Sequence, residues 1–168
     1  YLNRHLGLPS NEVRAILLAS DNSVWYATAQ GVVQQTPDGK LSHFNEQNGL
    51  PAHFSMGLAE DREGRIWIAT GIGLAYIQQG IVHVVSFPEH SDAQHAFSFS
   101  VVEKGTWITT DRGLAYFDNA TKALSVIEKS QGLPVDKLFS IGIDHNSGVW
   151  LSSNQGVILT SLSSLKED

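Results

Sequence analysis

The sequence predicts an all-β protein made of β-propeller blades, with about four four-stranded antiparallel repeats of roughly 42 residues. The first observation is the spacing of its only tryptophans, which lie 42, 40 and 43 residues apart: Trp25, Trp67, Trp107 and Trp150. The second is that a threonine or serine follows each tryptophan by three positions, and a glycine by six. The third is a Gly-Leu-Pro sequence 18 residues before three of them, beginning at Gly7, Gly49 and Gly132.

Each repeat divides into short segments rich in β-branched and aromatic residues, bounded by turn residues, as strands are. In the first repeat we expect strands at 11–19, 23–29, 31–36 and 41–45. In the second repeat we expect them at 53–60, 65–70, 73–78 and 81–86. In the fourth repeat we expect 138–143, 149–153 and 156–161, and the sequence leaves open whether 161–168 adds a last strand.

The third repeat is irregular. It lacks Gly-Leu-Pro, which a longer polar loop at 87–94 replaces, and its first strand at 96–102 is followed by a shortened turn at 103–105. We expect the repeats to cover about 7–48, 49–88, 89–131 and 132–168. Residues 1–5 align with 41–45 in this interpretation, so 1–6 are expected to be the outer strand of a preceding blade.

The repeated residues are interpreted as structural. The tryptophan lies in the middle of the second strand, where its ring would wedge between neighbouring blades. The threonine or serine three residues later could bond to the backbone of the following turn. These residues are therefore not counted as candidate site residues.

Composition excludes several classes of function. The net charge is −6 and the 11 basic residues are scattered, which argues against nucleic acid as a partner. The absence of cysteine excludes thiolate metal sites and cysteine nucleophiles. No run of about 20 apolar residues predicts a membrane span, so no membrane contact by this segment is expected. Because the chain starts at Tyr1 without a methionine, we expect it to be a piece of a longer precursor.

Candidate ligand-binding residues come from two sets of loops. In a propeller, the loops that precede the first strands share a face with the turns between second and third strands, and loops on a rigid scaffold commonly carry binding sites. The first set offers Asn11, His53, His95 and Asp136, and the second offers Gln30, Arg112 and Gln155. This mixture suits a polar small molecule or an oligosaccharide, although all of these could simply be solvated loop residues.

No catalytic residue, metal site or cofactor is predicted. The seven histidines show no ligand spacing. The stretch 144–148 (DHNSG) superficially resembles a calcium loop but lacks its closing glutamate, so it is interpreted as a hairpin turn. Gly71-Ile72-Gly73 lacks the third glycine and the helix of a dinucleotide-binding motif.

The stretch from Leu50 to Tyr76 (LPAHFSMGLAEDREGRIWIATGIGLAY) resembles the two-component regulator propeller repeat. The first and fourth units also resemble it, with Val32 and Val157 in place of leucine, whereas the third resembles it only over 107–117. The resemblance implies a non-catalytic sensor region on the periplasmic or extracellular side of a bacterial membrane protein. The output domain would be a histidine kinase or a diguanylate cyclase outside this chain, and some members of the family sense oligosaccharide fragments.

The resemblance also implies more than four blades in the intact propeller. The chain could be an arc of a larger ring, could associate with a second chain, or could close as a four-bladed ring; self-association is expected. Two other functions remain open. One is a protein-interaction scaffold, and the other is a propeller lyase or hydrolase that uses His53 or His95 as a base.

Overall fold

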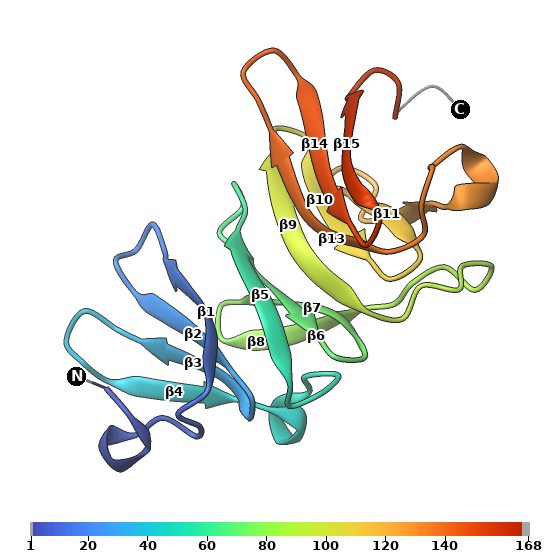
Figure 1. The fold of residues 1–168 in the computed structure, drawn as a ribbon. Coiled ribbons are helices and arrows are strands. Elements are labelled where there is room, and N and C mark those ends of the chain that lie inside the picture. The colour runs from blue at the N-terminus through green and yellow to red at the C-terminus, as the bar shows by residue number, and fades with distance from the viewer. Residues whose placement is uncertain (1, 166–168) are drawn as a thin grey trace. The chain divides into compact units, whose positions relative to one another are not determined.

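The computed structural model describes residues 2–165, which form fifteen β-strands in four antiparallel sheets (Figure 1). Within each sheet the strands follow one another in chain order, so every neighbouring pair is joined by a local turn. The chain divides into two compact units at Ser86 and Phe87, and each unit holds two sheets. The all-β prediction and the blade pattern are confirmed.

In unit 1 both sheets have four strands. The first sheet contains β1 (Val13–Leu18), β2 (Val24–Thr28), β3 (Gly31–Gln35) and β4 (Leu41–Phe44). The second contains β5 (Ser55–Glu60), β6 (Ile66–Thr70), β7 (Gly73–Gln78) and β8 (Ile81–Val85). The expected strands are present, and most begin or end one or two residues inside the expected bounds.

In unit 2 the two sheets differ. The third sheet contains β9 (Ala96–Val102), β10 (Gly105–Thr110), β11 (Gly113–Asp118) and β12 (Leu124–Ile127). The fourth contains β13 (Leu138–Ile143), β14 (Gly148–Ser153) and β15 (Gly156–Ser161), three strands among the described residues. Residues 162–165 form a turn rather than a strand, and the expected tail at 166–168 lies outside the described residues.

The prediction of an outer strand at residues 1–6 is wrong for residues 2–6, the part of it that the structure describes. Arg4–Leu6 instead form a 3-10 turn, which the Asn3 side chain caps by accepting a hydrogen bond from the Leu6 N–H. The turn ends at Gly7, whose φ of 110° only glycine adopts freely. Glu46–Asn48 and Lys129–Gln131 form the same turn before the other two Gly-Leu-Pro sequences. The first residues therefore correspond to the turn that follows an outer strand, two positions later than the alignment assumed.

The predicted wedge role of the tryptophans is confirmed inside each unit. Trp25 belongs to a core cluster with Ile66, Ile68 and Ala75 of the neighbouring sheet. Trp107 belongs to another with Leu138 and other residues of the fourth sheet. Trp67 is fully buried, whereas Trp150 is 48% exposed. The same residue at the same repeat position therefore has two different environments.

The threonine or serine that follows each tryptophan bonds to the backbone of the next turn, as predicted. Its hydroxyl donates to the glycine carbonyl that opens the third strand, at 2.9–3.1 Å in the four repeats: Thr28 to Gly31, Thr70 to Gly73, Thr110 to Gly113 and Ser153 to Gly156. This bond fixes the turn between the second and third strands, which carries three of the seven predicted site residues.

Three of the four tryptophans also donate an indole N–H to the turn between the first two strands. Asp61 Oδ2 accepts from Trp67 at 2.7 Å, and Asp144 Oδ2 from Trp150 at 3.2 Å. The stretch 144–148 is thus a turn held by its aspartate, as interpreted. The shortened turn of the third repeat has no aspartate, and the buried Nε1 of Trp107 has no hydrogen-bond partner.

This difference predicts unequal effects of a tryptophan-to-phenylalanine change. Both Trp67 and Trp107 are buried, so Trp67→Phe and Trp107→Phe lose similar volume. Only Trp67→Phe also removes a hydrogen bond to a carboxylate, which contributes about 1.5–3 kcal/mol. Urea unfolding should therefore show a larger loss of stability at position 67. Equal losses would mean that the bond from Trp67 to Asp61 contributes nothing measurable.

Candidate functional site

In every sheet, the loop before the first strand and the turn between the second and third strands lie at the same end. The first strand begins opposite the residue at which the second ends, with the pairs Val13 and Thr28, Ser55 and Thr70, Ala96 and Thr110, and Leu138 and Ser153. We call this the leading end of a sheet. The two loop sets chosen from the sequence therefore meet, sheet by sheet.

A β-bulge lies at the leading end of each first strand. The register of the pairing shifts one residue after the strand begins, so that one extra residue has no partner: Arg14, Met56, Phe97 and Phe139. Bulges redirect a side chain and recur next to binding sites. Four bulges at one repeat position give each unit two redirected side chains at its leading end.

In unit 1 one of the two redirected residues is a cation, Arg14, and the other, Met56, contacts it. The guanidinium carbon of Arg14 lies 3.4 Å from the centroid of the Phe54 ring, and its Nη1 lies 3.5 Å from the sulfur of Met56. The Glu12 carboxylate accepts from Arg14 Nε at 3.0 Å. The cation is therefore fixed by an aromatic face, a thioether and a carboxylate.

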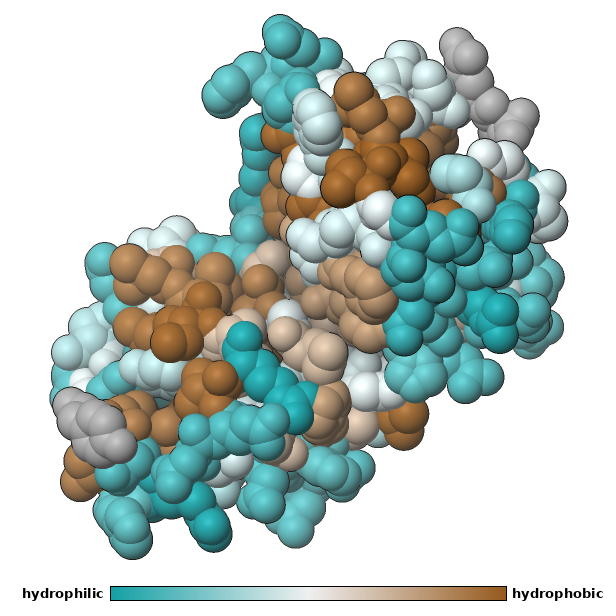
Figure 2. Space-filling view, viewed as in Figure 1, coloured by the Kyte–Doolittle hydropathy of each residue, from teal (hydrophilic) through white to brown (hydrophobic). Residues whose placement is uncertain are grey.

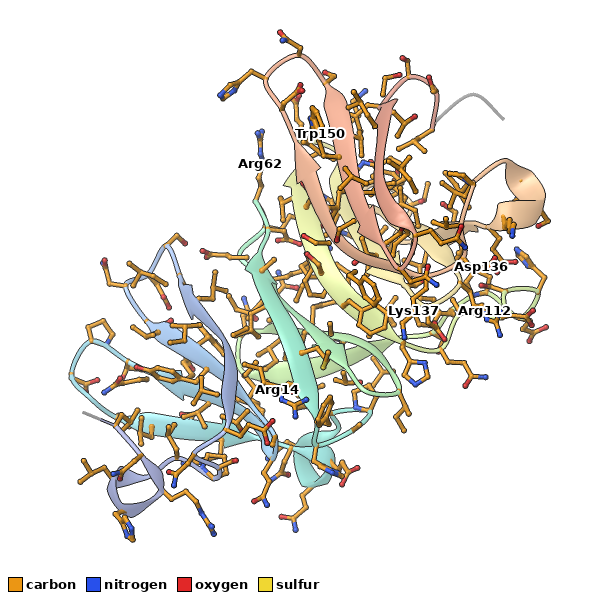
Figure 3. All side chains as sticks on the ribbon, in the orientation of Figure 1. Arg14, Arg62, Arg112, Asp136, Lys137 and Trp150 are labelled. Carbon is orange, nitrogen blue, oxygen red and sulfur yellow. The ribbon has the colours of Figure 1, made fainter. Side chains whose placement is uncertain are left out.

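In unit 2 the redirected residues are aromatic. The rings of Phe97 and Phe139 meet edge to face, with centroids 6.0 Å apart, and Phe139 is 41% exposed. The ammonium of Lys137 lies 5.6 Å and 5.5 Å from the two rings. Figure 3 shows Lys137, Asp136 and Arg112 at the same end of the sheets of unit 2. This end combines an apolar platform with charged groups.

The residues predicted in unit 1 have mainly local contacts. The Asn11 side chain accepts from the Arg4 N–H at 2.9 Å, which ties down the N-terminal turn. His53 is exposed, with Nδ1 3.4 Å from Glu46 Oε1, and its carbonyl accepts from the Gly31 N–H. Gln30 is exposed beside Gly31, so the structure brings Gln30 and His53 to one place.

The residues predicted in unit 2 divide into two groups. His95 Nδ1 lies 3.0 Å from Asp111 Oδ2, and Arg112 follows Asp111 in the same turn, so His95 and Arg112 are brought together. Asp136 precedes Lys137 and the Phe139 bulge. Gln155 is exposed in the turn of the fourth sheet, where its N–H donates to Ser153 Oγ.

Asp111 is an electrostatic feature of this site. Burial raises the pKa of its carboxyl, but hydrogen bonds from the backbone N–H groups of His95 and Gln94 and from the His95 ring outweigh burial, so that the pKa lies below its usual value near 3.8. The ionised carboxylate therefore fixes the loop of the irregular repeat against the turn that carries Arg112.

A lowered pKa makes the stability from Asp111 pH-dependent. The contribution is fully present above about pH 4 and is lost as pH falls through the lower folded-state pKa. We expect Asp111→Asn to lower the unfolding free energy at pH 7 by about 1 kcal/mol, a value reduced for partial exposure. Urea titrations should show this difference shrinking below pH 4. A difference independent of pH would contradict the role of the ionised form.

Sequence reasoning missed the redirected side chains and their neighbours. The candidates were chosen for polarity, whereas Phe54, Met56, Phe97 and Phe139 are apolar and were assigned to strands. The apolar pattern of these strands does not mark the bulges. They show only in the structure, where the first strands of unit 1 have six residues and pair with second strands of five.

Unit 2 also contains a cavity of about 760 Å³. Its lining includes Trp107 and Tyr116 with the charged side chains of Lys104 and Asp118. Burial, followed by the charge of Asp118, raises the pKa of the Tyr116 hydroxyl. Within residues 2–165 no group of three or more histidine or acidic side chains could hold a metal ion, and no helix is long and apolar enough to cross a membrane.

Residues 49–71 match the family model described as Two component regulator propeller. This stretch runs from the second Gly-Leu-Pro through β5 and β6 to the turn after Thr70. Over these residues the chain is similar to the repeat of that family. Among curated proteins, no match was found.

Solved structures share the propeller fold. The extracellular domain of the hybrid two component system BT3049 from B. thetaiotaomicron superposes with a TM-score of 0.85 at 23% identity, over 98% of this chain and 24% of that chain. The extracellular domain of BT4673, a hybrid two component system of the same organism, superposes with a TM-score of 0.75 at 21% identity, over 89% of this chain and 21% of that chain. Streptogramin B lyase superposes with a TM-score of 0.69 at 14% identity, over 93% of this chain and 56% of that chain. This chain therefore spans less than a quarter of the length of each of the two extracellular domains.

Proposed function

We propose that this chain is a ligand-sensing propeller segment, without catalytic activity of its own, of a membrane-anchored bacterial receptor that signals through a two-component kinase or a diguanylate cyclase. The observation that carries the proposal is the propeller repeat at 49–71 in a fold similar to two extracellular sensor-system domains. The segment would lie on the periplasmic or extracellular side of the membrane.

The proposed ligand is a polar small molecule or an oligosaccharide bound at the leading ends of the sheets. In unit 2, the ring faces of Phe97 and Phe139 offer an apolar surface on which a sugar ring can stack. Lys137, Arg112 and Asp136 lie at the same end and can bond to hydroxyl or acidic groups. In unit 1, Arg14 is held in position by Glu12 and Phe54 for the same purpose. All seven candidates chosen from the sequence remain part of this proposal.

Thermal denaturation with a panel of neutral and acidic oligosaccharides tests ligand binding. A ligand at about 100 times its dissociation constant stabilises the folded state by about 2.7 kcal/mol, so the melting temperature should rise with dose. Lys137→Ala should abolish most of the rise, whereas Lys40→Ala, a change in the exposed turn before β4, should leave it intact. If no compound shifts the melting temperature, the result would contradict ligand binding and favour the protein-interaction scaffold.

The receptor architecture has a separate test, which is the coding sequence downstream of Asp168. We expect a membrane helix followed by a kinase or cyclase domain. Differential ligand affinity for two arrangements of paired propellers would then pass the signal to that domain. A downstream sequence without a membrane helix or an output domain would contradict the anchored receptor.

Two observations favour an enzyme as the second candidate. The bond from His95 to Asp111 could orient a histidine base, and the fold is also similar to that of a lyase. Turnover of a carbohydrate or cyclic ester substrate by the purified chain, lost in His95→Ala, would support this function. Turnover retained in a His53→Ala/His95→Ala variant would exclude these histidines as the base.

A further inference from the structure

A contact between a cation and an aromatic ring recurs in both units, with the two repeat positions exchanged. In unit 1 the cation is the bulge residue Arg14 of β1, and its ring partner Phe54 directly precedes β5. In unit 2 the ring is the bulge residue Phe97 of β9, and its cationic partner Lys137 directly precedes β13. The leading end of each unit therefore presents a cation against an aromatic face, between two neighbouring sheets.

The two cations differ in how their charge is compensated. In unit 1 the carboxylate of Glu12, which directly precedes β1, pairs with the Arg14 guanidinium. The residue that directly precedes β9 in unit 2 is His95, and its ring bonds to Asp111 instead. Within residues 2–165 the Lys137 ammonium forms no ion pair, and its contacts are with aromatic rings. Unit 2 therefore lacks the carboxylate that compensates the cation of unit 1.

The acidic side chains of the neighbouring loops do not replace that carboxylate. The Asp111 carboxylate accepts from two backbone N–H groups and from a histidine ring. Glu128 Oε1 accepts from a hydroxyl at 2.7 Å and from a backbone N–H at 3.2 Å, both in the irregular loop before β9. Asp136 directly precedes Lys137 in the chain, but the two side chains form no ion pair in the described part of the structure. Because Lys137 is exposed, its charge is accessible to a ligand.

We propose that the leading end of unit 2 binds an acidic saccharide, a sugar ring that carries a carboxylate, and that Lys137 binds this carboxylate. The inference rests on the proposed function and narrows its ligand class. The ligand carboxylate would compensate Lys137 as Glu12 compensates Arg14 in unit 1. Hydrogen bonds between charged groups are about twice as strong as those between neutral groups, so this contact favours an acidic sugar over a neutral one.

The aromatic rings beside Lys137 favour a sugar over a simple anion. The Phe97 and Phe139 rings meet edge to face, and the ammonium lies 5.6 Å and 5.5 Å from their centroids. Figures 2 and 3 show hydrophobic surface next to hydrophilic side chains at this end of unit 2, where Lys137 is labelled. A sugar ring stacked on the aromatic surface places an attached carboxylate near the ammonium, whereas an inorganic anion would contact the ammonium alone.

Calorimetric titration of the chain with short uronic acid oligosaccharides tests the inference. Di- to tetrasaccharides of glucuronate, galacturonate and mannuronate are the probes, and the carboxyl-reduced, neutral form of each is its matched control. We expect an acidic saccharide to bind about ten-fold or more tightly than its neutral form. This preference should shrink at high salt, because Lys137 is exposed and its interaction with the carboxylate is then screened.

Three variants locate the preference. Lys137→Met keeps the aliphatic part of the side chain and removes the charge, so it should abolish the preference and leave the weaker binding of the neutral form. Lys129→Met removes another exposed charge at the same end of unit 2, in the turn after β12, and should keep the preference. Asp136→Asn removes a negative charge beside Lys137, so it should tighten binding of the acidic form by about two-fold or more.

The outcomes separate this inference from the proposed function. Equal binding of the acidic and neutral forms, or a preference that persists in Lys137→Met, would overturn the inference and leave the ligand-sensing function intact. A preference lost equally in Lys129→Met would also overturn it, because the general charge of this end would then attract the ligand. If the wild-type chain bound neither form of any probe, both the inference and ligand sensing of saccharides would be contradicted.

Discussion

Asp61→Ala is expected to lower the free energy of unfolding by about 3–5 kcal/mol, because it leaves a buried guanidinium without its main counterion. The side chains of Asp61 and Arg65 are 0% and 1% exposed, and Asp61 Oδ2 accepts from Arg65 Nε at 2.6 Å. The same oxygen accepts from the Trp67 indole at 2.7 Å, so one substitution removes both bonds. Urea unfolding followed by circular dichroism measures the loss.

Asp144→Ala is the matched control. Asp144 accepts the same kind of backbone bonds within its turn and the same indole bond, but it is exposed, and Gly148 stands where the second repeat has Arg65. We expect Asp144→Ala to cost about 1 kcal/mol. The double change Asp61→Ala/Arg65→Met should recover part of the loss, because it removes the stranded charge. Equal losses for Asp61→Ala and Asp144→Ala would show that the buried ion pair adds nothing beyond the turn.

The fold could be predicted largely because the repeat supplies each signal several times. The spacing of the tryptophans located the second strand of each sheet, and the glycine six residues later located the turn to the third strand of each sheet. What failed was short and local. A 3-10 turn such as Arg4–Leu6 has three residues, too few to show a helical periodicity, and its signal is the Asn3 cap alone.

The candidate site could be predicted only in part. Polarity and topology indicated the loops at the leading ends, and pairing of the strands placed those loops together. They did not indicate Phe97 and Phe139, because an alternating apolar strand gives no sign of where a bulge will turn one residue toward another surface. The pairing of His95 with Asp111 also depends on the irregular loop before β9, whose path no repeat template describes.

The shortened turn of the third repeat separates the two interactions that hold a repeat tryptophan, its hydrogen bond and its packing. Without an aspartate, the turn cannot accept from Trp107, so the indole N–H is buried without a partner. The ring nevertheless stays in place, 4.6 Å from the centroid of Tyr116 and inside the unit 2 core. Packing alone is therefore sufficient to hold a repeat tryptophan, and the hydrogen bond is an addition.

The last prediction follows from that conclusion. Trp107→Ala should lower the free energy of unfolding by about 3–5 kcal/mol, because the ring is 1% exposed and its removal leaves a large cavity in the unit 2 core. No hydrogen bond is lost with the indole, so the whole effect comes from packing. Chemical denaturation with urea measures the change.

Trp150→Ala is the comparison within the same unit and the same repeat position. Half of that ring is already exposed, so its removal should cost about 1 kcal/mol, mostly through the lost bond to Asp144. If Trp150→Ala cost as much as Trp107→Ala, the environment of the ring would not be what sets the contribution of a repeat tryptophan.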